Sequence, residues 1–135
     1  MNTPETKPEF LMLFRGKGWD EGLSPEELRQ AMDQITAWMD GLKEQGKMKG
    51  GQALGGERRI VSAKKGRAVV DGPFAESKEA VGGSLLLEAS SLEEVLDIAS
   101  ACPMLKYGVN IEVRAVLDEC PTFKRAQERL LQAPA

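Results

Sequence analysis

The stretch Asp71-Gly72-Pro73-Phe74-Ala75-Glu76-Ser77-Lys78-Glu79 joins two apolar runs near the middle of the chain, and Gly82-Gly83 follows it closely. Rigid backbone residues and a dense set of charges coincide in this stretch. Gly72-Pro73 predicts a tight turn, because glycine reaches positive φ and proline fixes its own φ. We therefore predict an ordered loop that holds Asp71 at the end of a strand.

The composition is that of one ordinary globular domain. The chain has 135 residues, of which 41% are hydrophobic and 29% charged, and this length fits a single domain. The formal net charge of -3 gives no support for nucleic-acid binding. No apolar run approaches the roughly 20 residues of a membrane span, and the first residues lack the apolar core of a signal peptide. We expect a cytoplasmic protein.

The chain contains no histidine and two cysteines, Cys102 and Cys120, each of which precedes a proline. A Ser-His-Asp or Cys-His nucleophile therefore cannot be built within the chain, and a zinc site with histidine ligands is excluded. Because no secretion signal is present, we expect two free buried thiols rather than a disulfide. The sequence predicts no cofactor and no metal site.

The elements before the loop start with the apolar run Phe10–Phe14, which is typical of a strand buried on both faces. Ser24-Pro25-Glu26-Glu27 predicts a helix start, with Ser24 as the cap, proline in the first turn and Glu27 completing a capping box. An apolar stripe with helical spacing predicts that this helix faces the core and ends near Gly46. The stripe contains Leu28, Ala31, Met32, Ile35, Trp38, Met39 and Leu42.

A bent or bulged strand is predicted over Met48–Leu54, because this segment contains Gly50-Gly51. A hairpin follows, formed by Arg58–Ala63 and Arg67–Val70 with a turn at residues 64–66.

Behind the loop, Ser84–Glu88 predicts a central strand, and Ser90-Ser91 with the glutamates that follow predicts a capped helix. This helix ends at Cys102-Pro103, because the residue before proline avoids the α region. Val109–Ala115 alternates between apolar and polar residues, as in a strand with one wet or interfacial face. Beyond Pro121, Phe123, Ala126 and Leu130 recur at helical spacing and predict a final amphipathic helix.

The element order is therefore β-α-β-β-β, the loop, β-α-β and a terminal helix. It predicts an α+β fold with a single mixed or antiparallel sheet, two main helices on one face and a C-terminal helix. This is the ferredoxin-like arrangement. One face of such a sheet needs cover, and we expect a second copy of the chain to supply it in a homodimer.

The nonapeptide Asp71–Glu79 with Gly82-Gly83 resembles the YCII-related family, in its DGPF branch. The helix with Trp38, the pair Cys102-Pro103 and a final strand at Ile111–Arg114 fall in the matching order. The resemblance spans residues 9–117 as a single domain and leaves residues 118–135 as a helical tail. It implies a ferredoxin-like fold that pairs into a dimeric α/β barrel and encloses a cleft.

The family has no generally established activity. An active site built around a His-Asp pair has been proposed for its smaller members, and this chain, without histidine, offers only Asp71 in that role. Relatives of the DGPF branch occur beside or fused to sigma-factor-like transcription proteins, so the resemblance also implies a regulatory role as an alternative.

Two interpretations of the loop remain open. In the functional one, Asp71 and Glu76 are the catalytic candidates, and either becomes a general base only where burial raises its pKa. The ligand-binding candidates are then Gly72, Lys78, Gly82 and Gly83. In the structural one, Asp71 caps its own turn, Phe74 fills the core and the remaining charges form a solvated rim. Gly82-Gly83 likewise either presents N–H groups to an anion or allows close packing of the backbone.

Two hypotheses of function follow. The first is a homodimer that binds a small polar molecule in a cleft under the Asp71–Glu79 loop, with any reaction left open. The second is a regulatory or protein-interaction module that uses the C-terminal helix to contact a protein partner. Neither hypothesis involves a membrane or a nucleic acid.

Overall fold

The protein is described here from a computed structural model, which covers residues 7–16, 18–57, 59–71 and 81–133. Within these ranges the elements are β1 (Glu9–Arg15), α1 (Pro25–Glu44), β2 (Met48–Ala53), β3 (Ile60–Lys64), β4 (Arg67–Asp71), β5 (Val81–Glu88), α2 (Leu92–Ser100), the short 3-10 helix η2 (Pro103–Tyr107), β6 (Asn110–Ala115) and α3 (Pro121–Gln132). The predicted order of strands and α-helices is confirmed, and η2 is an addition. None of the helices in these ranges has both the length and the apolarity that a bilayer span requires.

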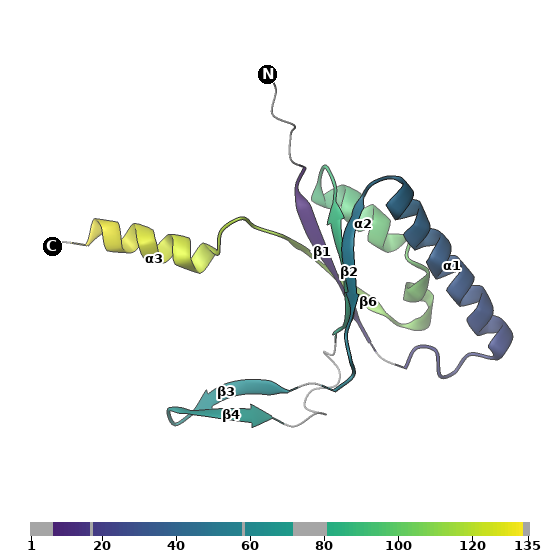
Figure 1. Cartoon of the computed structure of the whole chain (residues 1–135), viewed down its shortest axis with the longest axis horizontal. Helices are drawn as coiled ribbons and strands as arrows, with labels where there is room; N and C mark the ends of the chain where they lie inside the picture. The colour runs from purple at the N-terminus through teal and green to yellow at the C-terminus, as the bar shows by residue number, and fades with distance from the viewer. Residues whose placement is uncertain (1–6, 17, 58, 72–80, 134–135) are drawn as a thin grey trace, which may run out of the picture.

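Four strands form an antiparallel sheet in the order β2-β5-β1-β6. At its centre, Met12 of β1 lies opposite Leu85 of β5 on one side and opposite Val113 of β6 on the other. Helices α1 and α2 cover one face of the sheet, whereas the opposite face, called the open face below, carries no described helix (Figure 1). The predicted α+β fold with an antiparallel sheet and three helices is therefore confirmed.

The hydrophobic core lies between the sheet and these two helices. Met12, Leu87 and Val95 are its most deeply buried large side chains. Because side chains alternate between the faces of a strand, Leu11 and Leu13 of β1 lie on the open face, where they are only partly buried. The predicted burial of this strand on both faces therefore does not hold within a single chain.

Local chemistry determines both ends of α1. Ser24 Oγ accepts a hydrogen bond from the Glu27 N–H at 3.2 Å, and the Glu27 carboxylate accepts one from the Ser24 N–H at 3.0 Å. The helix is followed by Gly46 with a left-handed φ of 71°, as predicted. The prediction that Met32 faces the core is wrong, because its side chain is exposed. Met32 follows the buried Ala31 in the helix and therefore lies beside the line of contact with the core.

The hairpin of β3 and β4 is a separate two-stranded sheet, so the predicted single sheet is wrong. Its turn places Lys65 and Gly66 at φ values of 51° and 77°, as two-residue hairpin turns require. Gly55-Gly56 interrupts the chain after β2, and β5 occupies the neighbouring position in the main sheet. Among the described residues, the hairpin pairs with neither outer strand of that sheet, β2 or β6.

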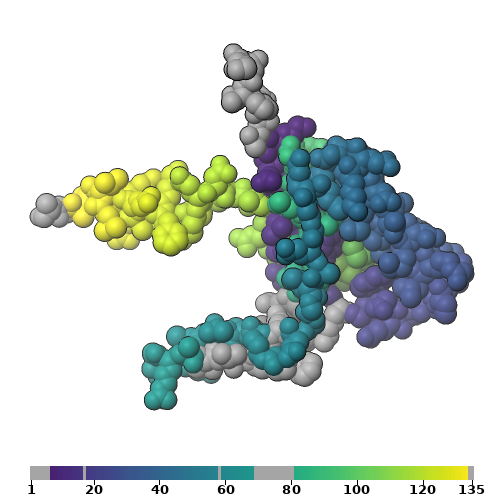
Figure 2. Space-filling view, in the orientation of Figure 1, coloured from purple at the N-terminus to yellow at the C-terminus, as the bar shows by residue number. Residues whose placement is uncertain are grey.

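The hairpin and α3 both project from the body of the molecule on the side away from α1 and α2 (Figure 2). No described residue of α3 is buried, and Phe123 and Leu130 are 73% and 75% exposed. The amphipathic helix predicted beyond Pro121 is thus present, but its apolar residues stay exposed to solvent among the described parts of the chain. Cys120 at its start is also exposed, so the prediction of two buried thiols holds for Cys102 alone.

Candidate functional site

A pocket of about 640 Å³ lies between α1 and the β2 edge of the sheet. Its floor is built from β2 and the start of β5, whereas Met39 and Lys43 line it from α1. Trp19 reaches it from the segment between β1 and α1, and Met104 from η2. Its volume is in the range of about 300–1,000 Å³ that small-molecule sites occupy.

Glycines bring the two strands of the floor close together. A Cβ atom on Gly83 would lie 2.9 Å from the backbone oxygen of Gln52, a distance that real Cβ atoms essentially never show. A Cβ atom on Gly51 would lie 2.7 Å from a side-chain carbon of Leu85. Strand β5 therefore needs glycine at position 83 to pair as it does, whereas at position 51 the nearest atom is the end of the flexible Leu85 side chain. The missing side chains leave the floor of the pocket open.

Aromatic contacts fix the surroundings of the pocket. The Trp19 ring stacks on Tyr107 with centroids 5.4 Å apart, and Phe14 meets Trp38 edge to face at 6.4 Å. Trp38 also donates from its ring nitrogen to the backbone oxygen of Ile98 at 3.2 Å. Such contacts order large side chains, so the aromatic part of the wall is preorganised.

The charges at the pocket are cationic. Lys43 and Lys49 are the ionisable residues among its described lining. The Lys49 ammonium pairs with the Glu88 carboxylate at 3.1 Å. In the described ranges, Lys43 has no carboxylate within ion-pair distance, and it belongs to the last turn of α1.

The predicted site residues fall into three groups. Gly82 and Gly83 line the pocket, and they belong to β5, which begins three residues earlier than the predicted Ser84. Asp71 is the last residue of β4 and its backbone lies opposite Ile60, so its predicted place at a strand end is confirmed. The other predicted members, Gly72, Glu76 and Lys78, lie outside the described residues, and their roles stay predictions.

Sequence reasoning missed most of the pocket wall. Trp19 had a detectable signal, since it is the one large residue in a glycine-rich loop. Met39 was assigned to the core face of α1, and Lys43 carried no signal at all. For Gly83, the geometry supports the interpretation that glycine allows close packing of the backbone. The close contact is between the paired strands β2 and β5.

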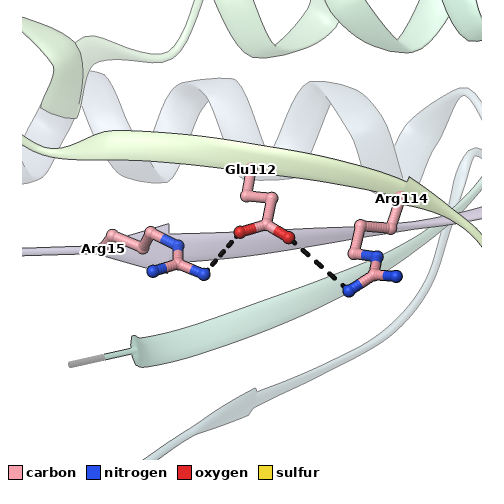
Figure 3. Close-up of polar contacts among 3 residues, drawn as sticks. All are labelled: Arg15, Glu112 and Arg114. Atoms are coloured by element: carbon pink, nitrogen blue, oxygen red, sulfur yellow. Dashed lines mark hydrogen bonds and ion pairs between the residues drawn. The ribbon is translucent and has the colours of Figure 1, made fainter. Parts of the chain in front are cut away.

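A second group of charges, Arg15, Glu112 and Arg114, lies on the open face (Figure 3). One Glu112 oxygen pairs with the Arg15 guanidinium, and the other lies 3.8 Å from a guanidinium nitrogen of Arg114. Arg15 Nε is buried and has no acceptor among the described residues. Buried donors without a partner are rare in native proteins, so this donor needs an acceptor that the described residues do not provide.

The two cysteines differ in reactivity. Burial raises the pKa of the Cys102 thiol, whereas the backbone N–H groups of Phe123 and then Thr122 lower the pKa of Cys120. The exposed Cys120 is therefore the more nucleophilic thiol. In the part of the chain that the structure describes, no group of three or more cysteines and carboxylates is arranged to hold a metal ion.

Comparison with known proteins finds the YCII-related domain over residues 7–124. No curated protein matches the chain. One similar solved structure is the 5-chloro-2-hydroxyhydroquinone dehydrochlorinase from Burkholderia phenoliruptrix in complex with 2,5-dihydroxybenzoquinone. It covers 82% of this chain and 95% of its own, at 20% identity and a TM-score of 0.43. A likeness at this level says nothing about substrate or reaction.

Proposed function

We propose that this chain, which belongs to the YCII-related domain family, acts as a homodimer that binds a small molecule in the pocket beside β2 and β5. The pocket itself carries the proposal, because it combines a volume of about 640 Å³ with a preorganised aromatic wall and a glycine floor. Concave, mostly apolar sites with a few placed polar groups are the usual form of small-molecule sites.

We assign the stretch Asp71–Glu79 to the same site because of its position in the sequence. It leads through two residues into the pocket-lining Gly82, which supports its assignment to the same site. In an enzymatic form of the proposal, Asp71 or Glu76 acts as the general base, and burial by the bound ligand supplies the raised carboxyl pKa that this role needs. Gly72 and Lys78 contact the polar part of the ligand. The nonapeptide also supports placing the chain in the DGPF branch of the family.

The homodimer is proposed from the open face of the sheet. The sheet elements follow the order β-α-β-β-α-β, which supports the ferredoxin-like arrangement and, with it, pairing into a dimeric barrel. Leu11, Leu13 and Leu86 on this face are only partly buried. The projecting hairpin and α3 flank the same side (Figure 1), and Arg15 Nε there has no acceptor among the residues that the structure describes. A second copy docked on this face covers the leucines and can supply the acceptor.

The alternative of a regulatory module linked to sigma-factor-type transcription systems is not favoured. Its structural support is the exposed apolar side of α3, and a second copy of the chain accounts for that feature as well.

A pocket-filling variant tests the binding proposal. Ala53 lines the pocket on an edge strand, so Ala53→Trp places a large ring at the site, whereas Ala63→Trp makes the same change on an exposed strand of the hairpin. A library of small metabolites is screened by thermal shift against the native protein and both variants. We expect compounds that stabilise the native protein and Ala63→Trp and fail to stabilise Ala53→Trp.

Two outcomes contradict the proposal. Either no compound stabilises the native protein, or the stabilising compounds act equally on Ala53→Trp. The oligomeric state is measured separately by light scattering on the eluting native protein, for which we expect twice the chain mass.

A further inference from the structure

The described lining of the pocket carries charge of one sign. It contains Lys43 and Lys49 and no carboxylate. Cationic groups beside a low-dielectric wall focus a positive potential into a cleft. These two lysines therefore attract an anionic group and repel a cationic one.

Lys43 and Lys49 differ in what already neutralises them. The Lys49 ammonium lies 3.1 Å from the Glu88 carboxylate. Lys43 is exposed and has no carboxylate within 4.0 Å among the described residues. Among the described lining residues, Lys43 is thus the cation that is available to an incoming anion.

The remainder of the lining is suited to an apolar body. Trp19 and Phe14 present aromatic rings, and the lining also includes the thioether side chains of Met39, Met48 and Met104. Methionine adapts to irregular shapes and contacts aromatic rings favourably. Such a wall accommodates a ring-sized apolar group better than a sugar or a free amino acid.

We infer that the pocket takes a small organic anion with an apolar, ring-sized body, whose anionic group meets Lys43 at the end of α1. The inference rests on the proposed binding function of the pocket and adds the chemical class of its ligand. It assigns Lys43 as the residue that selects for negative charge.

The test uses two probes of nearly equal shape, naphthalene-2-sulfonate and its uncharged counterpart naphthalene-2-sulfonamide. Equilibrium dialysis at low ionic strength measures their affinities for the native full chain, for Lys43→Gln and for Lys64→Gln. Lys64→Gln removes the same charge from the exposed hairpin. Ala53→Trp, which fills the pocket, reports whether binding occurs there.

We expect both probes to bind the native protein and to lose affinity in Ala53→Trp. Lys43→Gln weakens sulfonate binding about threefold, as loss of one partly exposed ion pair implies, and leaves sulfonamide binding unchanged. Lys64→Gln changes neither affinity. Added salt weakens the sulfonate and spares the sulfonamide, because screening acts on the charged probe.

Two results overturn the inference in distinguishable ways. If both probes bind in the pocket and Lys43→Gln affects them equally or not at all, anion selection fails and the binding pocket stands. If neither probe binds, or if Ala53→Trp binds both as well as the native protein, the proposed function of the pocket fails together with the inference.

Discussion

Replacing Gly83 by alanine tests the close approach of β2 and β5 that forms the floor of the pocket. The added Cβ atom would lie 2.9 Å from the Gln52 backbone oxygen, whereas ordinary contacts begin at 3.4 Å. The difference of 0.5 Å has to be absorbed by backbone, since the opposing atom is not the end of a flexible side chain. Overpacking of this kind costs about 1–3 kcal/mol.

The unfolded chain partly offsets this cost. Exchanging glycine for alanine reduces the freedom of the unfolded state and stabilises a protein by about 0.4–1 kcal/mol where the native backbone allows it. We therefore expect Gly83→Ala to lower the free energy of unfolding by about 1–2 kcal/mol. Gly82→Ala is the matched control, because a Cβ atom there would meet its nearest described neighbour, the Gly16 oxygen, at 3.8 Å. We expect this control to be neutral or more stable.

Urea unfolding followed by tryptophan fluorescence, at one protein concentration for all variants, measures both changes. If Gly83→Ala is as stable as Gly82→Ala, the strands are not held at the separation that the structure shows, and the account of the pocket floor is wrong.

Three other predictions concern parts of the chain away from the pocket. Iodoacetamide at neutral pH modifies Cys120 at least about tenfold faster than the buried Cys102, as followed by mass spectrometry, and equal rates refute the assigned environments. Glu94 has a lowered pKa, chiefly because its carboxylate accepts a hydrogen bond from the Ser90 N–H. Its stabilising contribution is therefore present above the ordinary value of 4.5 and lost as the pH falls through the folded-state pKa. Glu94→Gln should accordingly lower the melting temperature at pH 7 and differ little from native protein near pH 3; a pH-independent difference contradicts this. Removal of residues 118–135 should weaken the dimer at least about tenfold, as loss of about 1.4 kcal/mol or more of interface energy implies; sedimentation showing an unchanged dimer refutes the role of α3.

Most of the fold could be predicted, because the ends of its helices are determined by residues close to them in the sequence. Ser24 with Glu27 starts α1 and Gly46 follows its end, and each acts within a turn of its own position. The alternation over Val109–Ala115 likewise predicts the two faces of β6, whose Val113 lies opposite the buried Met12 and whose Glu112 lies opposite Leu13. Such signals depend on neighbours in the sequence, so they can be recognised without knowledge of the tertiary structure.

The pocket is different, because it depends on contacts between distant segments. Lys43 shares it with Trp19 and Met104, and no spacing in the sequence relates these three residues. The separate hairpin was missed for a similar reason: a strand pattern at Ile60–Lys64 shows that a strand forms, but not which sheet it joins.

The most direct test of small-molecule binding in this pocket is an NMR titration of nitrogen-15-labelled protein with naphthalene-2-sulfonate. We predict that the largest amide shift changes occur at Gly51, Gly83 and Val109, which line the pocket from three separate segments. Changes confined to α3 or to the open face, or no saturable change at all, would contradict the account.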